Sequence, residues 1–122
     1  MRDIKFRVWD KTQKNYLNEE RSKSVLIETN GLVFETFYYN WEMDIEKTNN
    51  YLIEQYTGLK DKNGVEIYEG DIVKCYDLLH KNHFIGIVGF DSASFMINDD
   101  DVVKHYRWMD YEVEVVGNIH NA

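Results

Sequence analysis

The residues best suited to chemistry are one cysteine and two histidines that lie close together in the chain. Cys75, His80 and His83 would supply three ligands of a tetrahedral zinc site. Their spacing matches no zinc finger or ribbon, however. The histidines fall in a polar stretch, and Cys75 falls in an apolar one, where a buried thiol is ordinary. We therefore predict no metal site and no cofactor.

Two further groups of side chains carry acid or nucleophilic potential. A cysteine nucleophile needs a histidine base that a third group orients, and no such arrangement is evident around Cys75. The run Asp99-Asp100-Asp101 offers carboxylates to a divalent cation, but calcium loops place their ligands at alternate positions around a glycine, and this run does not. We interpret the run as a solvated acidic loop. No catalytic residue is predicted, and we expect that the protein is not an enzyme.

An aromatic cluster, formed by Phe37, Tyr38, Tyr39 and Trp41, is the more informative feature. On a strand, alternate rings point to opposite faces, so both faces are hidden only if something covers the second face. That cover is either another part of the same chain or a partner, since Tyr and Trp are favoured anchors of interfaces. Both interpretations stay open. The four aromatic residues are our candidate interface.

The elements that must position these residues are predominantly strands. Ile4, Phe6 and Val8 alternate with other residue types, which predicts a strand over residues 3–9 with one buried face. The polar stretch 10–15 predicts a hairpin return. Asn30-Gly31, between two β-branched and aromatic runs, predicts a second hairpin.

The segment between Asn40 and Asn50 lacks a clean period. Met43, Ile45 and Lys47 alternate as in a strand, whereas the same stretch is also compatible with one helical turn. The sequence does not decide between strand and helix here.

Residues 55–75 form a hub of turns around which the chain is organised. Asn63-Gly64 suits a two-residue type I′ turn, in which both central residues need positive φ. Farther along, Gly86 and Gly89 interrupt an apolar run and predict a bulge or a bend. Short strands with turn residues at regular spacing are typical of a small barrel or sandwich.

The length and composition limit the architecture. A chain of 122 residues forms one domain or two small subdomains that share a core, with a plausible seam near residues 50–56. No apolar run approaches the roughly 20 residues of a membrane span. The single cysteine excludes an internal disulfide and is compatible with a reducing compartment. We expect a cytoplasmic protein without membrane contact.

The net charge of −8 argues against binding to nucleic acid, which depends on cationic side chains. The charge is uneven along the chain. Residues 1–23 contain seven Lys or Arg against four acidic residues, a net of +3, which leaves −11 for the remainder. A basic N-terminal segment would attract the acidic body, within one subunit or between neighbours.

Three stretches of the chain resemble the YopX-like proteins of bacteriophages and prophages. They are residues 5–10, 55–74 and 114–119, and they match in order and in place, so that the resemblance covers essentially the full chain. The resemblance implies a mainly β fold with an SH3-like barrel portion in the C-terminal half, a tendency to self-associate, and a phage or prophage origin. It implies no catalytic residue, because the family has no assigned activity.

Together these observations predict a mainly β protein, a small barrel or sandwich. Residues 1–122 form a single YopX-like domain, with 1–55 (hairpins) and 56–122 (SH3-like barrel) as candidate subdomains. The function that we expect is that of a non-catalytic protein–protein interaction module that forms homo-oligomers and binds an unknown host or phage protein. The alternatives are an acidic decoy of a host protein that binds nucleic acid, and a barrel that binds nucleic acid or a small ligand.

Overall fold

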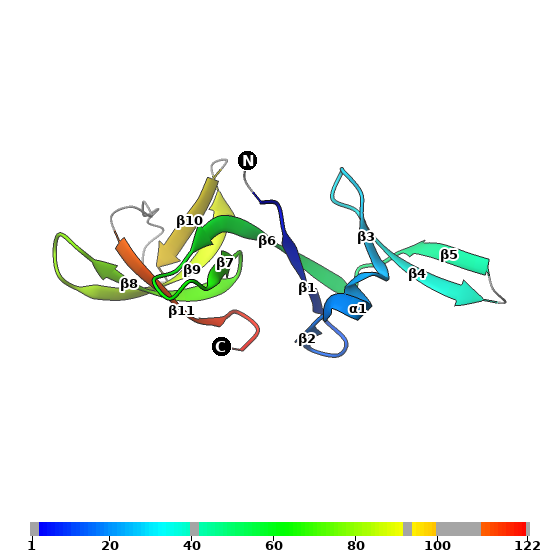
Figure 1. Ribbon diagram of the computed structural model, residues 1–122, viewed down its shortest axis with the longest axis horizontal. Coiled ribbons are helices and arrows are strands. Elements are labelled where there is room, and N and C mark those ends of the chain that lie inside the picture. The colour runs from blue at the N-terminus through cyan, green and yellow to red at the C-terminus, as the bar shows by residue number, and fades with distance from the viewer. Residues whose placement is uncertain (1–2, 40–41, 92–93, 100–110, 122) are drawn as a thin grey trace. The chain divides into compact units, whose positions relative to one another are not determined.

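A computed structural model describes residues 3–39, 42–91, 94–99 and 111–121 (Figure 1). Over these residues the protein is mainly β, which confirms the predicted fold class. The short helix α1 spans Glu19–Ser22. The strands are β1 (Phe6–Asp10), β2 (Asn15–Tyr16), β3 (Val25–Ile27), β4 (Val33–Tyr39), β5 (Glu42–Lys47), β6 (Tyr51–Lys60), β7 (Glu66–Tyr68), β8 (Asp71–Asp77), β9 (His83–Asp91), β10 (Ser94–Asp99) and β11 (Tyr111–Asn118). No helix among the described residues is long and apolar enough to cross a membrane.

The chain divides into two compact units. Unit 1 comprises Met1–Phe6 and Glu54–Ala122, and unit 2 comprises Arg7–Ile53. A four-stranded sheet has the order β2-β1-β6-β7.

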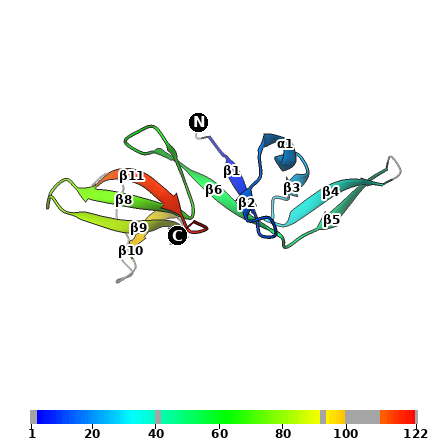
Figure 2. The same ribbon diagram turned by 90° about the horizontal axis from the view of Figure 1, so that it is seen from below.

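Unit 1 contains the main core of the protein. An antiparallel sheet with the order β10-β9-β8-β11 curls as part of a half-barrel (Figure 2). Its four strands each place at least one side chain in the core, where they pack with Ile67 of β7. These core residues are Ile67, Val73, Cys75, Val88, Ile97 and Val113. The SH3-like topology of this half stays a prediction.

Both Asn-Gly pairs lie in hairpin loops, but neither forms the two-residue turn. In the hub, Gly64 has φ 82° and Asn63 does not have positive φ, so the predicted type I′ turn is wrong. Instead, Asp61 N–H donates to the Val65 carbonyl over a three-residue loop, and Gly64 N–H donates to the Asp61 carbonyl. The loop around Gly31 has the same two hydrogen bonds, which confirms the predicted hairpin there. This wider loop needs only one residue with a left-handed backbone conformation, and the glycine adopts it.

Two other hairpin loops repeat the pattern Asp-x-x-x-Lys-Asn, at residues 10–15 and 77–82. In each loop the aspartate carboxylate accepts hydrogen bonds from the N–H groups two and three residues later. The lysines, Lys14 and Lys81, have φ 55° and 57°, and each donates its N–H to the carbonyl of that aspartate at 2.8 Å. The hairpin predicted at residues 10–15 is thereby confirmed. The repeated pattern is a sequence signal for this turn that alternation alone does not reveal.

The glycines of β9 serve close packing and do not form a bulge. The β8–β9 and β9–β10 ladders run through Gly86 without a register shift, and the β9–β10 ladder does so through Gly89. A Cβ atom on Gly86 would lie 2.5 Å from Cγ2 of Ile97, which is far inside contact distance. The sheet's register shift occurs instead in β11, between Val115 and Gly117.

Unit 2 contains the β1–β2 hairpin, α1 and a three-stranded sheet with the order β3-β4-β5. The undecided segment is therefore a strand, β5. The buried face predicted for the first strand is only partly correct. Val8 is 8% exposed, whereas Phe6 and, just before the strand, Ile4 are 46% and 64% exposed.

Candidate interaction surface

The structure does not bring together the residues considered for metal binding. Cys75 faces the core of unit 1 and is fully buried, while its neighbour on β8, Tyr76, lies on the opposite face. His83 pairs with Tyr76 across the ladder, and their ring centroids lie 4.8 Å apart with the rings tilted by 45°. His80 is exposed in the loop, with Nδ1 2.8 Å from Asp77 Oδ2. Over the described residues, no group of three His, Cys, Asp or Glu side chains is placed to hold a metal ion.

The geometry of Cys75 also disfavours a nucleophilic role. Burial raises the pKa of its thiol to about 12, so at neutral pH the thiolate is scarce. Over the part of the chain that the structure describes, burial is the cause of this shift and no ionisable partner offsets it. The acidic run considered for cation binding begins at the end of β10, with Asp99, and Asp100 and Asp101 lie outside the described residues.

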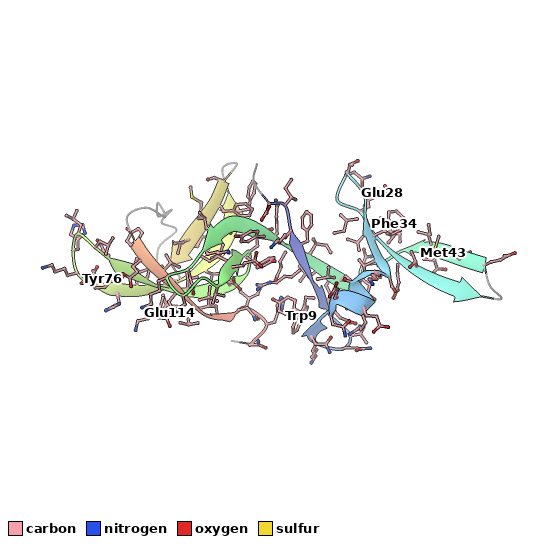
Figure 3. All side chains as sticks on the ribbon, in the orientation of Figure 1. Trp9, Glu28, Phe34, Met43, Tyr76 and Glu114 are labelled. Carbon is pink, nitrogen blue, oxygen red and sulfur yellow. The ribbon has the colours of Figure 1, made fainter. Side chains whose placement is uncertain are left out.

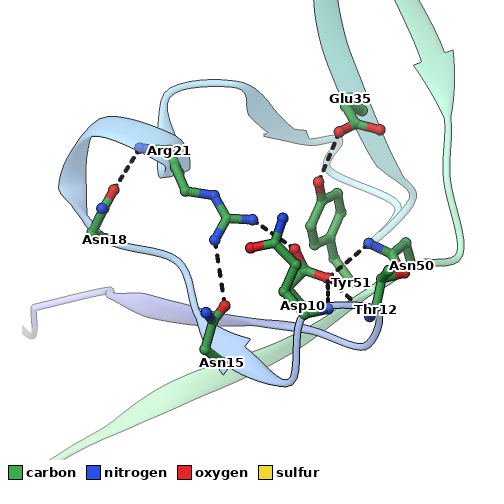
Figure 4. A network of polar contacts seen from close by, with 9 residues as sticks. Asp10, Thr12, Asn15, Asn18, Arg21, Glu35, Asn50 and Tyr51 are labelled. Carbon is green, nitrogen blue, oxygen red and sulfur yellow. Dashed lines mark hydrogen bonds and ion pairs between the residues drawn. The ribbon is translucent and has the colours of Figure 1, made fainter.

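A polar network in unit 2 is centred on the buried carboxylate of Asp10 (Figure 4). Its Oδ1 accepts hydrogen bonds from the N–H groups of Thr12 and Gln13 and from the Asn50 amide. Its Oδ2 lies 2.6 Å from the Arg21 guanidinium. The Gln13 N–H, together with the other donors, outweighs burial and lowers the pKa of Asp10 below its ordinary value. The carboxylate therefore stays ionised and ties the β1–β2 loop to α1 and to Asn50.

A second hydrogen-bonded pair connects this network to β4. Tyr51 donates its hydroxyl proton to Glu35 Oε1 at 2.8 Å, and burial, with the nearby Glu35 carboxylate, raises the pKa of Tyr51. The residues of both pairs line a cavity of about 350 Å³. The cavity is lined by Asp10, Thr12, Gln13, Leu17, Arg21, Ser24, Glu35, Thr36, Asn50 and Tyr51. Because these polar groups hydrogen-bond to one another, we interpret the network as a structural connection that holds β4 in place.

A second cavity, of about 270 Å³, lies on the outer side of the unit 1 sheet. It is lined by Lys62, Lys74, Tyr76, His83, Glu112 and Glu114. The Lys62 ammonium is 3.5 Å from a carboxylate oxygen of each of Glu112 and Glu114. Partly exposed ion pairs of this kind contribute little stability, and the cavity gathers no nucleophile and base within reach of each other.

One face of the β3-β4-β5 sheet is an exposed apolar surface. Residues that pair across neighbouring strands point to the same side, so Leu26, Phe34, Met43 and Ile45 share a face, which we call the apolar face. Phe34 and Met43 of this face are labelled in Figure 3. Leu26 is 43% exposed, and Met43 and Ile45 are each 52% exposed. Phe34 is half-buried. A hydrophobic face normally packs on a core, whereas three of these four side chains are exposed to solvent.

The opposite face of β5 is acidic. Glu42, Asp44 and Glu46 alternate with the apolar residues, and Glu46 lies opposite Glu35 on β4. Among the described residues, no ion pair reaches any of these four carboxylates. All six residues of β5 are exposed, and β5 is the last strand of its sheet. The outer backbone groups of β5 are therefore open to a further strand.

The predicted aromatic interface falls on this same hairpin. The backbone of Phe37, Tyr38 and Tyr39 forms the end of β4, and the register places them opposite Asp44, Met43 and Glu42. The side chains of these three residues, and Trp41 as a whole, lie outside the described part of the chain. The interface therefore stays a prediction. Sequence analysis missed Met43 and Ile45 as surface residues, although their alternation with acidic residues was a usable signal.

Comparisons with known proteins place the chain in a family. The family model described as YopX protein matches residues 5–122. A crystal structure of protein EF1440 from Enterococcus faecalis is 29% identical, with a TM-score of 0.59, and the match covers 98% of this chain and 95% of that one. A crystal structure of protein yopX from Bacillus subtilis has a TM-score of 0.64 at 23% identity, over 100% of this chain and 96% of that one, which shows the shared fold.

No curated protein matches the chain. The family match spans nearly the full length and includes all three stretches on which the resemblance rested. No function is assigned to the family. This chain belongs to the YopX family.

Proposed function

We propose that the protein is a non-catalytic protein–protein interaction module, and that copies of it associate through the β3-β4-β5 sheet of unit 2. The observation that carries the proposal is the apolar face, where Met43 and Ile45 are each 52% exposed on a strand without a buried residue. Small sheets in water need one face packed to be stable, so a covering partner would supply what this sheet lacks.

The free energy gained by burying these side chains indicates how much surface the contact between copies must include. Full burial of a large apolar side chain contributes about 1.5–3 kcal/mol, so covering a half-exposed one contributes about 1 kcal/mol. Leu26, Met43 and Ile45 would then contribute about 3 kcal/mol per copy. Because association costs roughly 4–15 kcal/mol, these three residues alone would be marginal. We propose that Phe37, Tyr38, Tyr39 and Trp41 extend the contact, as the sequence predicts.

The buried thiol of Cys75, with its raised pKa, supports a role without nucleophilic catalysis at that residue. The family resemblance adds the expectation of a phage or prophage origin, and the single cysteine adds the expectation of a place in the cytoplasm of the host. A host or phage protein would be the further partner. Nothing in the net charge of −8 favours nucleic acid as that partner.

The experiment is a mass measurement by light scattering after size-exclusion chromatography, over a wide range of protein concentration. We expect the wild type to form oligomers and Met43→Lys/Ile45→Lys to be monomeric. The matched control is Leu78→Lys/Leu79→Lys, which changes two adjacent apolar residues of unit 1 that are 56% and 80% exposed. The control should associate as the wild type does. A wild type that is monomeric at every concentration would refute the proposal.

A further inference from the structure

The polar cavity of unit 2 contains one negative charge that no cation balances. Its charged lining residues are Asp10, Arg21 and Glu35, so that two carboxylates face one guanidinium. The guanidinium is held by Asp10 at 2.6 Å and by the amide oxygen of Asn15 at 3.3 Å. Over residues 3–39, 42–91, 94–99 and 111–121, Glu35 takes part in no ion pair. The charge of Glu35 therefore stays without a counter-ion in this cavity.

The Glu35 carboxylate is also incompletely hydrogen-bonded. Glu35 is half-buried on β4, and its Oε1 accepts the hydroxyl proton of Tyr51 at 2.8 Å (Figure 4). This is the single hydrogen bond to its side chain within the described part of the chain. A carboxylate has about four acceptor sites, and withdrawing its charge from water without a partner costs free energy. Glu46, directly opposite Glu35 on β5, adds a like charge and a further reason for a cation to bind here.

The remaining groups near Glu35 are neutral. Burial, with the nearby Glu35 carboxylate, raises the pKa of Tyr51, so its hydroxyl stays protonated and donates to that carboxylate. Ser24 and Thr36 line the same cavity, and a hydroxyl oxygen accepts hydrogen bonds as well as donating one. A cation bound at Glu35 would thus meet one carboxylate oxygen and neutral oxygens, without a second positive charge placed against it.

The geometry selects the kind of cation. A guanidinium binds a carboxylate best through both oxygens, and Tyr51 already occupies Oε1. A divalent metal ion takes several oxygen ligands, whereas the described residues contain no group of three His, Cys, Asp or Glu side chains placed to hold one. An ammonium group is compact and has three donors for separate acceptors. The cavity, of about 350 Å³, lies at the small end of ligand sites and suits a small amine or one lysine side chain.

We infer that the cavity of unit 2 is a binding site for a primary ammonium group, with Glu35 as its counter-ion. Tyr51 holds the carboxylate in place, and Oε2 accepts from the ammonium. The ammonium belongs either to a free small amine or to a lysine side chain of a partner protein, which present the same chemistry. The site does not depend on the proposed self-association, because all residues that line it belong to unit 2 of one chain.

The test is a titration of the protein with n-butylamine, which is protonated at neutral pH and reproduces the lysine side chain. Proton–nitrogen correlation NMR spectra follow the binding. We expect saturable shifts of the backbone N–H groups of Ser24, Thr36 and Tyr51, with a dissociation constant in the millimolar range, because one partly exposed ion pair contributes little. The uncharged n-butanol, which has the same shape, should give no saturable shift.

Two matched variants locate the binding at the cavity. Glu35→Gln keeps the side-chain volume and an acceptor for Tyr51 but removes the charge, and we expect it to bind n-butylamine at least about 10-fold more weakly. Glu28→Gln makes the same change in net charge at an exposed residue of unit 2 that does not line the cavity, and it should bind as the wild type does. Near-UV circular dichroism checks that both variants are folded.

A short glycine peptide with one central lysine and blocked ends separates the two sources. A peptide that binds as tightly as n-butylamine assigns the site to a lysine side chain of a partner, and a peptide that is excluded assigns it to a free amine. If Glu35→Gln does not fold, the comparison of n-butylamine with n-butanol on the wild type decides.

Three results would overturn the inference: no saturable shift up to about 100 mM n-butylamine, equal binding of n-butanol, or unchanged affinity in folded Glu35→Gln. A monomeric wild type that binds the amine would refute the proposed self-association alone.

Discussion

Substituting Asn for Asp10 tests whether the buried carboxylate of unit 2 stabilises the fold by connecting the β1–β2 loop to α1 and to Asn50. The substitution retains Oδ1, so the donors of Thr12, Gln13 and Asn50 keep an acceptor. It replaces Oδ2, which lies 2.6 Å from Arg21, with an NH₂ group that faces another donor. The volume is unchanged, so the effect reports hydrogen bonding and charge.

The expected loss of stability follows from these contacts. A hydrogen bond to a charged group contributes about 1.5–3 kcal/mol. We take the lower part of that range for the lost contact, because the Arg21 side chain is 35% exposed and solvent screens it. The three retained bonds weaken because their acceptor becomes neutral. The total is about 2–3 kcal/mol, or roughly 10 °C in Tm for a domain of this size.

Urea denaturation at pH 7, followed by far-UV circular dichroism, measures this loss. Arg21→Met serves as the second corner of a double-mutant cycle, and we expect a coupling of about 1–2 kcal/mol between the two sites. The pKa of Asp10 is lowered in the folded state, so its contribution is present above the ordinary carboxyl pKa and is lost as pH falls through the folded pKa. The difference between wild type and Asp10→Asn should therefore shrink at acidic pH. A difference below about 0.5 kcal/mol at pH 7, or no coupling to Arg21, would refute the reasoning.

Three further predictions concern unit 1. Gly86→Ala should lower the free energy of unfolding by about 1–3 kcal/mol, because its Cβ would lie 2.5 Å from a core side chain. In the same urea titration, Gly117→Ala should be nearly neutral, because a Cβ there meets nothing within 4 Å. Cys75 should resist iodoacetamide at pH 8 in the folded protein and react at once in urea, since its thiol is buried with a pKa of about 12; rapid labelling of the native protein would contradict this. His120→Ala should destabilise by about 1–3 kcal/mol, because it leaves the carboxylate of Glu54, now 2.8 Å from Nε2, without that buried partner; an unchanged thermal midpoint would show that the pair is dispensable.

Local sequence patterns account for much of the fold. Alternation identified the first strand, and the polar stretch 10–15 and Asn30-Gly31 each identified a hairpin, because these signals depend on residues within a few positions of one another. The turn at Asn63-Gly64 was predicted with the wrong type. There, Asp61 accepts from two N–H groups of the loop and from Val115 N–H, a residue far along the chain. A contact at that separation leaves no local signal.

Tertiary structure alone decides which strand faces are covered. Met43 and Ile45 alternate like core residues and are exposed, and so are Ile4 and Phe6, while Gly86 is required by a side chain on the neighbouring strand β10. The sequence by itself determined where strands and most turns occur, because the pleat and the turns are properties of short segments. Whether a strand face is buried depends on which distant strands pack against it. For this reason the candidate interaction surface emerged only from the structure.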